Sequence, residues 1–494
     1  MRVRSGQVAK AVALAVALAV ATLVAPGFGL LAALSALIIG ALFLLPRAAL
    51  AFFAAFVVLQ PAIVNLAGGR ETALGGALQR VDEIILVAGV LRAGLVFATG
   101  RMRAEWMWAL LTGAFVVAGV ISGMINDAPS TVTVLGAFLA AKFPLFFLMG
   151  LTIRWTPADA RRIVKTAIVA PPVIVVIGLL LSVAPNNVQA IFLDPNAALE
   201  GGFRRGGLTA MTAPFSNPGQ LGWALACCSA FVVAALSAGT VGAARATTSV
   251  GAALFGILAS LRRKPLIGLP VAIMVGFGAG MRRRQRLFAL SASIALLALL
   301  GLVARTRIET LVVDTTANYL DPYSPTAART LLYITSWHIG IAHFPLGAGF
   351  GRFGGYISQL RYSPVYEEYG LSTTYGLSPE APYYMQDTYW PHILGESGWL
   401  GVACFALMIL LLWRRAMRIW YRDPQPWVRA LAFGAAMALV EVVVESAAAP
   451  VFEATLFAFV TALPLSAALV IGRASQDSLT LGAPEIVGAD SHAI

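Results

Sequence analysis

Charged residues are scarce in this chain of 494 residues, where Asp, Glu, Lys and Arg together make up 12%. A soluble protein of this size carries about twice that share, so the composition excludes an ordinary globular enzyme. Hydrophobic residues make up 59%, in continuous runs of roughly 18 or more along most of the length. Lipid offers backbone groups no partners, and unbroken apolar runs then favour helices. The sequence therefore predicts an all-α polytopic membrane protein with about 12–14 transmembrane helices and one large extracytoplasmic loop domain.

Cysteine and histidine are also rare. The three cysteines, Cys227, Cys228 and Cys404, all fall within apolar runs and form no disulfide framework or metal-ligand spacing. His338, His343 and His392 likewise show no ligand spacing with carboxylates. We therefore expect neither a metal nor another cofactor.

The formal charge of +12 does not indicate a nucleic-acid partner. The basic residues lie in short clusters between apolar runs, as the positive-inside rule requires, whereas a nucleic-acid protein gathers them on one soluble face. Most clusters fall on one side, which we take as the cytoplasm, with both termini on that side. Membrane lipids are therefore expected neighbours of a multi-pass chain.

The apolar runs divide the chain into four parts. The predicted parts are a transmembrane bundle at 1–304 with a short outer loop at 185–217, a large periplasmic loop at 305–391, C-terminal transmembrane helices at 392–472 and a disordered cytoplasmic tail at 473–494. The candidate spans within them are 9–25, 27–44, 49–66, 83–99, 105–124, 131–151, 163–183, 218–238, 247–261, 265–280, 286–304, 392–413, 427–447 and 450–471.

The short outer loop contains a basic, glycine-rich segment. Arg204 and Arg205 lie within Gly201–Leu208, and guanidinium groups offer forked donors suited to phosphate. Ser216 or Asn217 is placed to cap the next helix, whose N-terminal dipole also favours an anion. A plain turn whose arginines reach lipid headgroups remains an equal alternative.

A second basic cluster, Arg262, Arg263 and Lys264, contradicts the general charge pattern because it comes two crossings after the outer loop. If 247–261 is too short to span, the cluster lies inside the cell. If it faces outward, a negative group such as a diphosphate or a lipid headgroup must compensate it.

The large loop carries the remaining landmarks. Arg329 opens an amphipathic stretch suited to lying on a membrane surface, and Trp337 fits the interfacial preference of aromatic residues. The glycines of 347–355 are interpreted as a tight turn that brings Arg352 near the site, because no strand–helix unit surrounds them.

Candidate proton acceptors follow at the end of the loop. Asp387 and His392 are close in sequence, and either is able to take a proton from an attacking sugar hydroxyl. Charges at membrane depth are functional candidates by default, although pairing within the bundle is the simpler interpretation. These charges are Asp82, Glu83, Arg92, Lys142, Glu441 and Glu445.

In order and approximate spacing, these motifs resemble the O-antigen ligase / O-antigen polymerase superfamily of bacterial envelope glycosyltransferases. Arg329, Trp337, the turn Pro345–Gly349 and the segment Glu396–Gly401 carry the resemblance in the large loop, and the basic residues at 204–205 and 262–264 extend it. One departure is clear: Asp387-Thr388 stands where the ligases have a His-Asn pair. The base therefore stays open between Asp387 and His392, or is dispensable.

The resemblance implies a metal-independent glycosyltransferase that polymerises or ligates cell-surface polysaccharide at the outer face of the inner membrane. Its donor would be a polyprenyl-diphosphate-linked oligosaccharide and its acceptor a glycan or a lipid. Arg329, Asp387 and His392 would serve catalysis. The diphosphate-binding residues would be Arg204, Arg205, Arg262, Arg263, Lys264 and Arg352. The rival interpretation is a transporter or flippase for the same lipid-linked oligosaccharides.

Overall fold

The computed structural model describes residues 26–100, 105–193, 203–205, 208–262, 264–278 and 327–481. Nearly all regular structure in these residues is helical. The first half contains α2 (Pro26–Leu44), α3 (Pro46–Leu66), α4 (Ala73–Gln79), α5 (Val81–Ala98), α6 (Trp106–Ile125), α7 (Ser130–Ala140), α8 (Lys142–Leu151), α9 (Pro157–Ser182), α10 (Asn186–Phe192), β1 (Arg204–Arg205), β2 (Leu208–Thr209), α12 (Pro218–Ser237), α13 (Ala243–Ala259) and α14 (Lys264–Gly278). The second half contains α17 (Ala328–Ala342), α18 (Tyr356–Leu360), α19 (Val365–Glu368), α20 (Trp390–Arg422), α21 (Pro426–Glu445), the 3-10 turn η3 (Val451–Glu453), α22 (Thr455–Phe457), the π-helical turn η4 (Ala458–Ala462) and α23 (Leu463–Leu481).

The helices confirm a multi-pass, all-α membrane protein. Within the described residues, seven helices are long and apolar enough to cross a bilayer, or eight if the bent pair α7–α8 is one span. Three shorter apolar helices lie at Leu30–Leu44, Ala243–Ala259 and Lys264–Gly276. Each predicted span in the described part has a helical counterpart, while 9–25 and 286–304 lie outside it.

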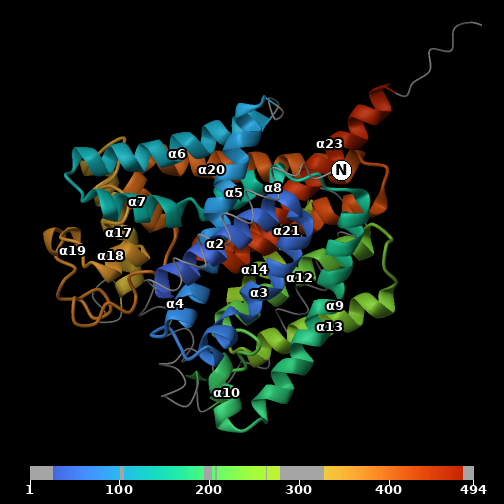
Figure 1. Ribbon diagram of the computed structural model, residues 1–494, viewed down its shortest axis with the longest axis horizontal. Coiled ribbons are helices and arrows are strands. Elements are labelled where there is room, and N and C mark those ends of the chain that lie inside the picture. The colour runs from blue at the N-terminus through green and yellow to red at the C-terminus, as the bar shows by residue number, and fades with distance from the viewer. Residues whose placement is uncertain are drawn as a thin grey trace, which may run out of the picture.

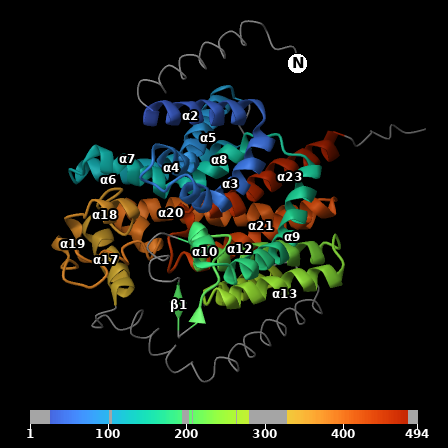
Figure 2. The ribbon, with the colours of Figure 1, turned by 60° about the horizontal axis from the view of Figure 1, so that its bottom comes forward.

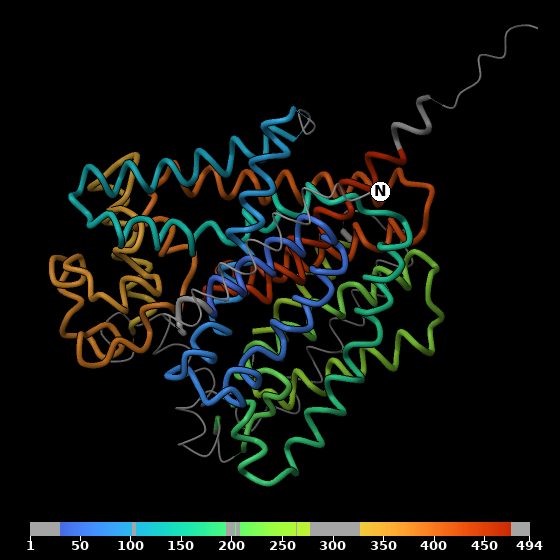
Figure 3. The backbone as a smooth tube through the Cα atoms, in the orientation of Figure 1, coloured from blue at the N-terminus to red at the C-terminus, as the bar shows by residue number. Residues whose placement is uncertain are grey.

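Helix α21 lies at the centre of the bundle. It packs against α12, α14, α20, α23 and α9, and most of its side chains are fully buried. Figure 2 shows it between the N-terminal helices α2, α3 and α5 and the α12–α13 pair. In Figure 3, α6 runs beside α20, although about 280 residues separate them in the sequence.

Two of the intramembrane charges pair within the bundle. The chain bends by 58° between α7 and α8, and Lys142 lies at this bend. Its ammonium is 3.4 Å from the carboxylate of Asp82, which also accepts a 2.6 Å hydrogen bond from Thr455. Lys142 and Asp82 therefore agree with the simpler interpretation, which was pairing within the bundle, because a charge in lipid needs a partner.

Residues 327–389 form a small unit at one end of the bundle, at the start of α20 (Figure 1). This unit has its own hydrophobic cluster, separate from the main core. Its buried members are Ala328, Leu332, Ile339, Ala348, Phe353, Val365, Tyr366, Leu371, Leu377 and Met385. We call the end of the bundle that carries this loop unit the loop end.

Helix α17 leaves one apolar face uncovered. Ile334, Trp337, Ile341 and Phe344 follow helical spacing and are 40%, 53%, 58% and 71% exposed. The Trp337 ring packs edge-on against Trp399, with centroids 4.9 Å apart. An exposed apolar stripe with tryptophan fits a helix that lies in a membrane interface, as the amphipathic sequence predicts.

At the opposite end of the bundle, the C-terminal helix is longer than predicted. Helix α23 continues to Leu481, so the prediction of a disordered tail from residue 473 is wrong for its first nine residues. Arg473 and Arg415 bridge to Glu105, at 3.4 and 3.5 Å, and this contact holds the extra turns. Residues 482–494 lie outside the described part.

Candidate functional site

Arg329 and Asp387 form an ion pair at the loop end. Arg329 lies in the first turn of α17, and Asp387 lies in the segment that leads into α20. Their side chains are 25% and 27% exposed, so the pair is reachable from outside the protein. Two of the three predicted catalytic residues therefore lie together, with a cation held beside a carboxylate at a partly exposed surface.

Lys264 joins this pair from another part of the chain. Its ammonium donates a hydrogen bond to the Ala448 carbonyl, just beyond the end of α21. It also lies within electrostatic range of Arg329, Asp387, Arg262 and Glu445. Lys264, at the start of α14, thus contacts the chain just after α21 and lies near the ion pair of the loop unit.

Arg262, two residues before Lys264 in the turn between α13 and α14, is held by α12. Its guanidinium donates to the Asn217 side-chain oxygen at 3.4 Å, and the same oxygen caps α12 by accepting from Gly219 N at 2.7 Å. Helix α13 therefore runs back along α12, which brings Arg262 to the N-terminal end of α12. Ala243–Ala259 is shorter than the seven candidate spans, so whether 247–261 crosses the membrane stays open. We call Arg262, Lys264 and Arg329 the cationic cluster.

Two carboxylates offset the positive charge of this cluster. Asp387 is the accessible one, and Glu445 is buried beside Lys264, Arg262 and Trp223. One turn earlier, Glu441 is fully buried against Gly268 of α14, and its carboxylate meets no hydrogen-bond donor among the described residues. The basic cluster at 262–264, if it faces outward, requires negative charge nearby, and Asp387 and Glu445 supply part of that charge.

The turn after α21 was not predicted from the sequence, and it contacts both α17 and the segment that leads into α20. The Ala447 carbonyl accepts 2.7 Å from the Tyr333 hydroxyl of α17, and Ser446 O accepts 3.0 Å from Tyr389 N. The sequence signal for this turn was the run of small residues at 446–449 after a glutamate. Small side chains leave the backbone carbonyls open to hydrogen-bond donors.

The glycine turn and the Glu396–Gly401 segment form a single interlocked structure. Ala348 N donates to Gly395 O at 2.7 Å, and Gly349 N donates to Glu396 O at 2.9 Å. Gly398 has a φ of +68°, and a Cβ there would overlap the backbone of Leu346. These backbone donors are used inside the protein, so the turn builds the loop unit and does not cradle a phosphate.

The turn also directs Arg352 away from its predicted place. The Arg352 guanidinium donates to Asn126 O at 2.7 Å and to Ala348 O at 3.3 Å. It therefore closes the C-terminal end of α6, whose carbonyls lack helical partners. Backbone carbonyls thus hold the charge of Arg352 in this structure, and its role in binding diphosphate stays a prediction.

His392 is likewise committed to the interior. It is 2% exposed, with Nε2 2.8 Å from Glu396 and Nδ1 2.6 Å from Glu453. Glu396 accepts a further 2.9 Å bond from Phe353 N. A buried ring with a carboxylate at each nitrogen is poorly placed to take a proton from an external hydroxyl, and the role of His392 as the base stays a prediction. The two carboxylates face opposite sides of the ring and cannot converge on one metal ion.

The remaining predicted residues are described only in part or not at all. Arg204 and Arg205 form β1, whose backbone pairs antiparallel with β2 in the register Arg204 to Thr209 and Arg205 to Leu208. Their side chains and Arg263 lie outside the described residues, so the phosphate-binding role of all three stays a prediction. No protein-family model and no curated protein matches this chain.

Proposed function

We propose that this protein is a membrane glycosyltransferase that takes a polyprenyl-diphosphate-linked glycan as donor. It polymerises or ligates cell-surface polysaccharide at the outer face of the inner membrane, on the same side as the loop unit. The observation that carries this proposal is that two segments distant in the sequence, the α13–α14 turn with Arg262 and Lys264 and the start of α17 with Arg329, lie close together at one end of the bundle.

The chemistry follows from this placement. An acceptor hydroxyl attacks the anomeric carbon of the donor sugar, and the bond from that carbon to the diphosphate oxygen breaks. The diphosphate leaves with the electron pair, and the cationic cluster stabilises its new charge through charge-assisted hydrogen bonds. Asp387 is the accessible carboxylate at this place and is the candidate acceptor for the hydroxyl proton.

The test is a reconstituted reaction. Purified protein in nanodiscs receives lipid-linked oligosaccharide and acceptor, and the products are resolved by size in the presence and absence of EDTA. The proposal expects longer or transferred glycan in both conditions. Movement of the lipid across a vesicle membrane without covalent product would instead support the flippase.

Ligation and polymerisation are separated in cells. A deletion strain that lacks all long chains on its lipid anchor points to ligation. A deletion strain that retains one repeat unit on the anchor points to polymerisation. An unchanged glycan profile would contradict both.

A further inference from the structure

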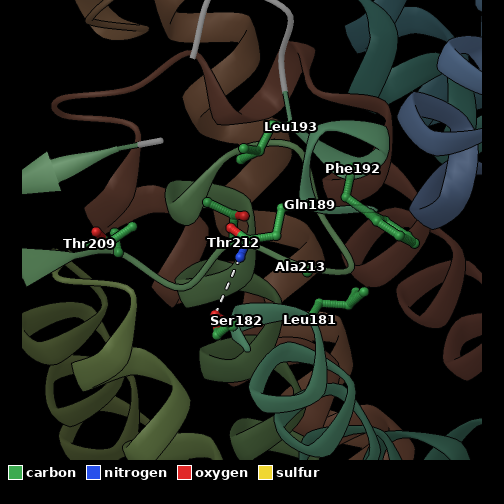
Figure 4. A pocket seen from close by; sticks show the side chains of 9 residues that line it. Leu181, Ser182, Gln189, Phe192, Leu193, Thr209, Thr212 and Ala213 are labelled. Atoms are coloured by element: carbon green, nitrogen blue, oxygen red, sulfur yellow. Dashed lines mark hydrogen bonds between the residues drawn. The ribbon is translucent and has the colours of Figure 1, made fainter. Parts of the chain in front are cut away.

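A pocket without an assigned role is lined in part by the segment that leads to Asn217, the partner of Arg262. It has a volume of about 260 Å³ and opens between the end of α9, α10 and the segment after β2 (Figure 4). Its lining combines hydroxyl and amide groups with apolar side chains. The lining residues are Leu181, Ser182, Gln189, Phe192, Leu193, Thr209, Ala210, Thr212 and Ala213.

The walls of the pocket are held in place from neighbouring elements. Asn65 of α3 donates to the carbonyls of Ile191 and Leu193, at 2.9 and 3.2 Å, and this fixes α10. Gln189 donates to the carbonyls of Ala184 at 2.8 Å and Ser182 at 3.3 Å. Both bonds use the amide nitrogen of Gln189.

The pocket is continuous in the chain with the residues expected to bind diphosphate. Thr209 on its rim is the strand partner of Arg204. The segment then passes Met211, whose N–H donates to Ala259 O at 2.9 Å, and reaches Asn217, the partner of Arg262. A group bound in the pocket would therefore lie at one edge of the diphosphate site.

We propose that this pocket binds a sugar residue of the lipid-linked glycan, next to its diphosphate. Sugars present hydroxyl groups on an apolar ring, so they suit a lining of Ser182, Gln189, Thr209 and Thr212 beside Phe192. The volume fits about one hexose rather than a long prenyl chain. This inference rests on the proposed function and adds a site of sugar recognition to it.

The test uses two adjacent residues of strand β2. Thr209→Trp places an indole in the pocket mouth, whereas Leu208→Trp adds the same bulk to a neighbour outside the lining. Both residues are exposed, so both variants should keep the melting temperature of the wild type. The probes are a bare polyprenyl diphosphate and the same lipid carrying glucose, galactose or N-acetylglucosamine, with binding measured in nanodiscs.

The wild type should bind at least one sugar-bearing lipid about tenfold more tightly than the bare lipid. Thr209→Trp should lose that preference while it binds the bare lipid normally, and Leu208→Trp should keep the preference. The inference is overturned if Thr209→Trp retains the preference, or if it weakens all probes equally, as a prenyl-binding pocket would. If the wild-type protein binds the bare and the sugar-bearing lipids equally well, the sugar pocket is overturned and the proposed function is not. If the wild-type protein binds none of the lipids, the proposed function is overturned as well.

Discussion

Arg329 is the cation whose removal tests the site most simply, because it is partly exposed and already faces a carboxylate. We expect Arg329→Gln to lower the transfer rate about 100-fold, as loss of one donor to a developing anion does. The matched control is Arg361→Gln, an exposed arginine of the same loop unit. Transfer rates of the purified variants give the answer, and equal rates for the two would contradict the role of Arg329.

We expect His392 to contribute to the stability of the fold rather than to the rate of glycan transfer. His392→Leu leaves Glu396 and Glu453 buried against an apolar group, and breaking such a pair costs about 3–5 kcal/mol. We therefore expect a much lower melting temperature in detergent and little protein in the membrane. Glu453→Gln keeps a hydrogen-bonding partner and should lose less stability. A His392→Leu protein that folds normally but fails in transfer would restore His392 as the base.

Residue roles at the site were only partly predictable from sequence. Arg329, Asp387 and Lys264 have charges without local partners in the sequence, and the structure brings them to one place. Arg352 and His392 looked equally suited, but each has one partner far away along the chain, Asn126 and Glu453 respectively, besides a partner four residues away. Only the tertiary fold reveals that backbone carbonyls and buried carboxylates hold them.

Among the contacts between helices and turns, the one between the glycine turn and α20 is one of those that hold the loop unit to the bundle. Gly398→Ala adds a Cβ against the backbone of Leu346 in a left-handed conformation. We expect a cost of about 3 kcal/mol or more, since strain and overlap add. Thermal unfolding and limited proteolysis of the loop unit measure it.

A matched glycine separates these two effects. Gly370 has a nearly identical φ of +69°, but no atom lies within 4 Å of an added Cβ. Gly370→Ala should therefore cost only the backbone strain, about 1 kcal/mol. If both variants lose the same stability, the close approach of Gly398 to Leu346 does not help to hold the loop unit to the bundle.

The sequence predicted long helices far better than short elements. Apolar runs near 20 residues give an unmistakable helix signal, and each such run in the described part is helical. Helices α4 and α10 have seven residues each and the two strands have two, so their weak local patterns were not recognised. Helix α23 extends beyond its apolar stretch, where Arg473 forms an ion pair with Glu105, a residue far away in the sequence.

For the whole molecule, the proposal requires that the loop end faces outward. Arg361→Cys, in the exposed loop unit, should react with a membrane-impermeant maleimide on intact spheroplasts. Gln425→Cys, in the exposed turn between α20 and α21, lies at the opposite end of α20 and should react only after permeabilisation. The reverse pattern would place the site in the cytoplasm and contradict the proposed topology.

The most direct test of the site is a cryo-electron microscopy map of the protein in nanodiscs with bound polyprenyl diphosphate. We expect the diphosphate density between Arg262, Lys264 and Arg329, at the loop end and beside Asp387. Density at the opposite end of the bundle, near Arg415 and Arg473, would contradict the proposal.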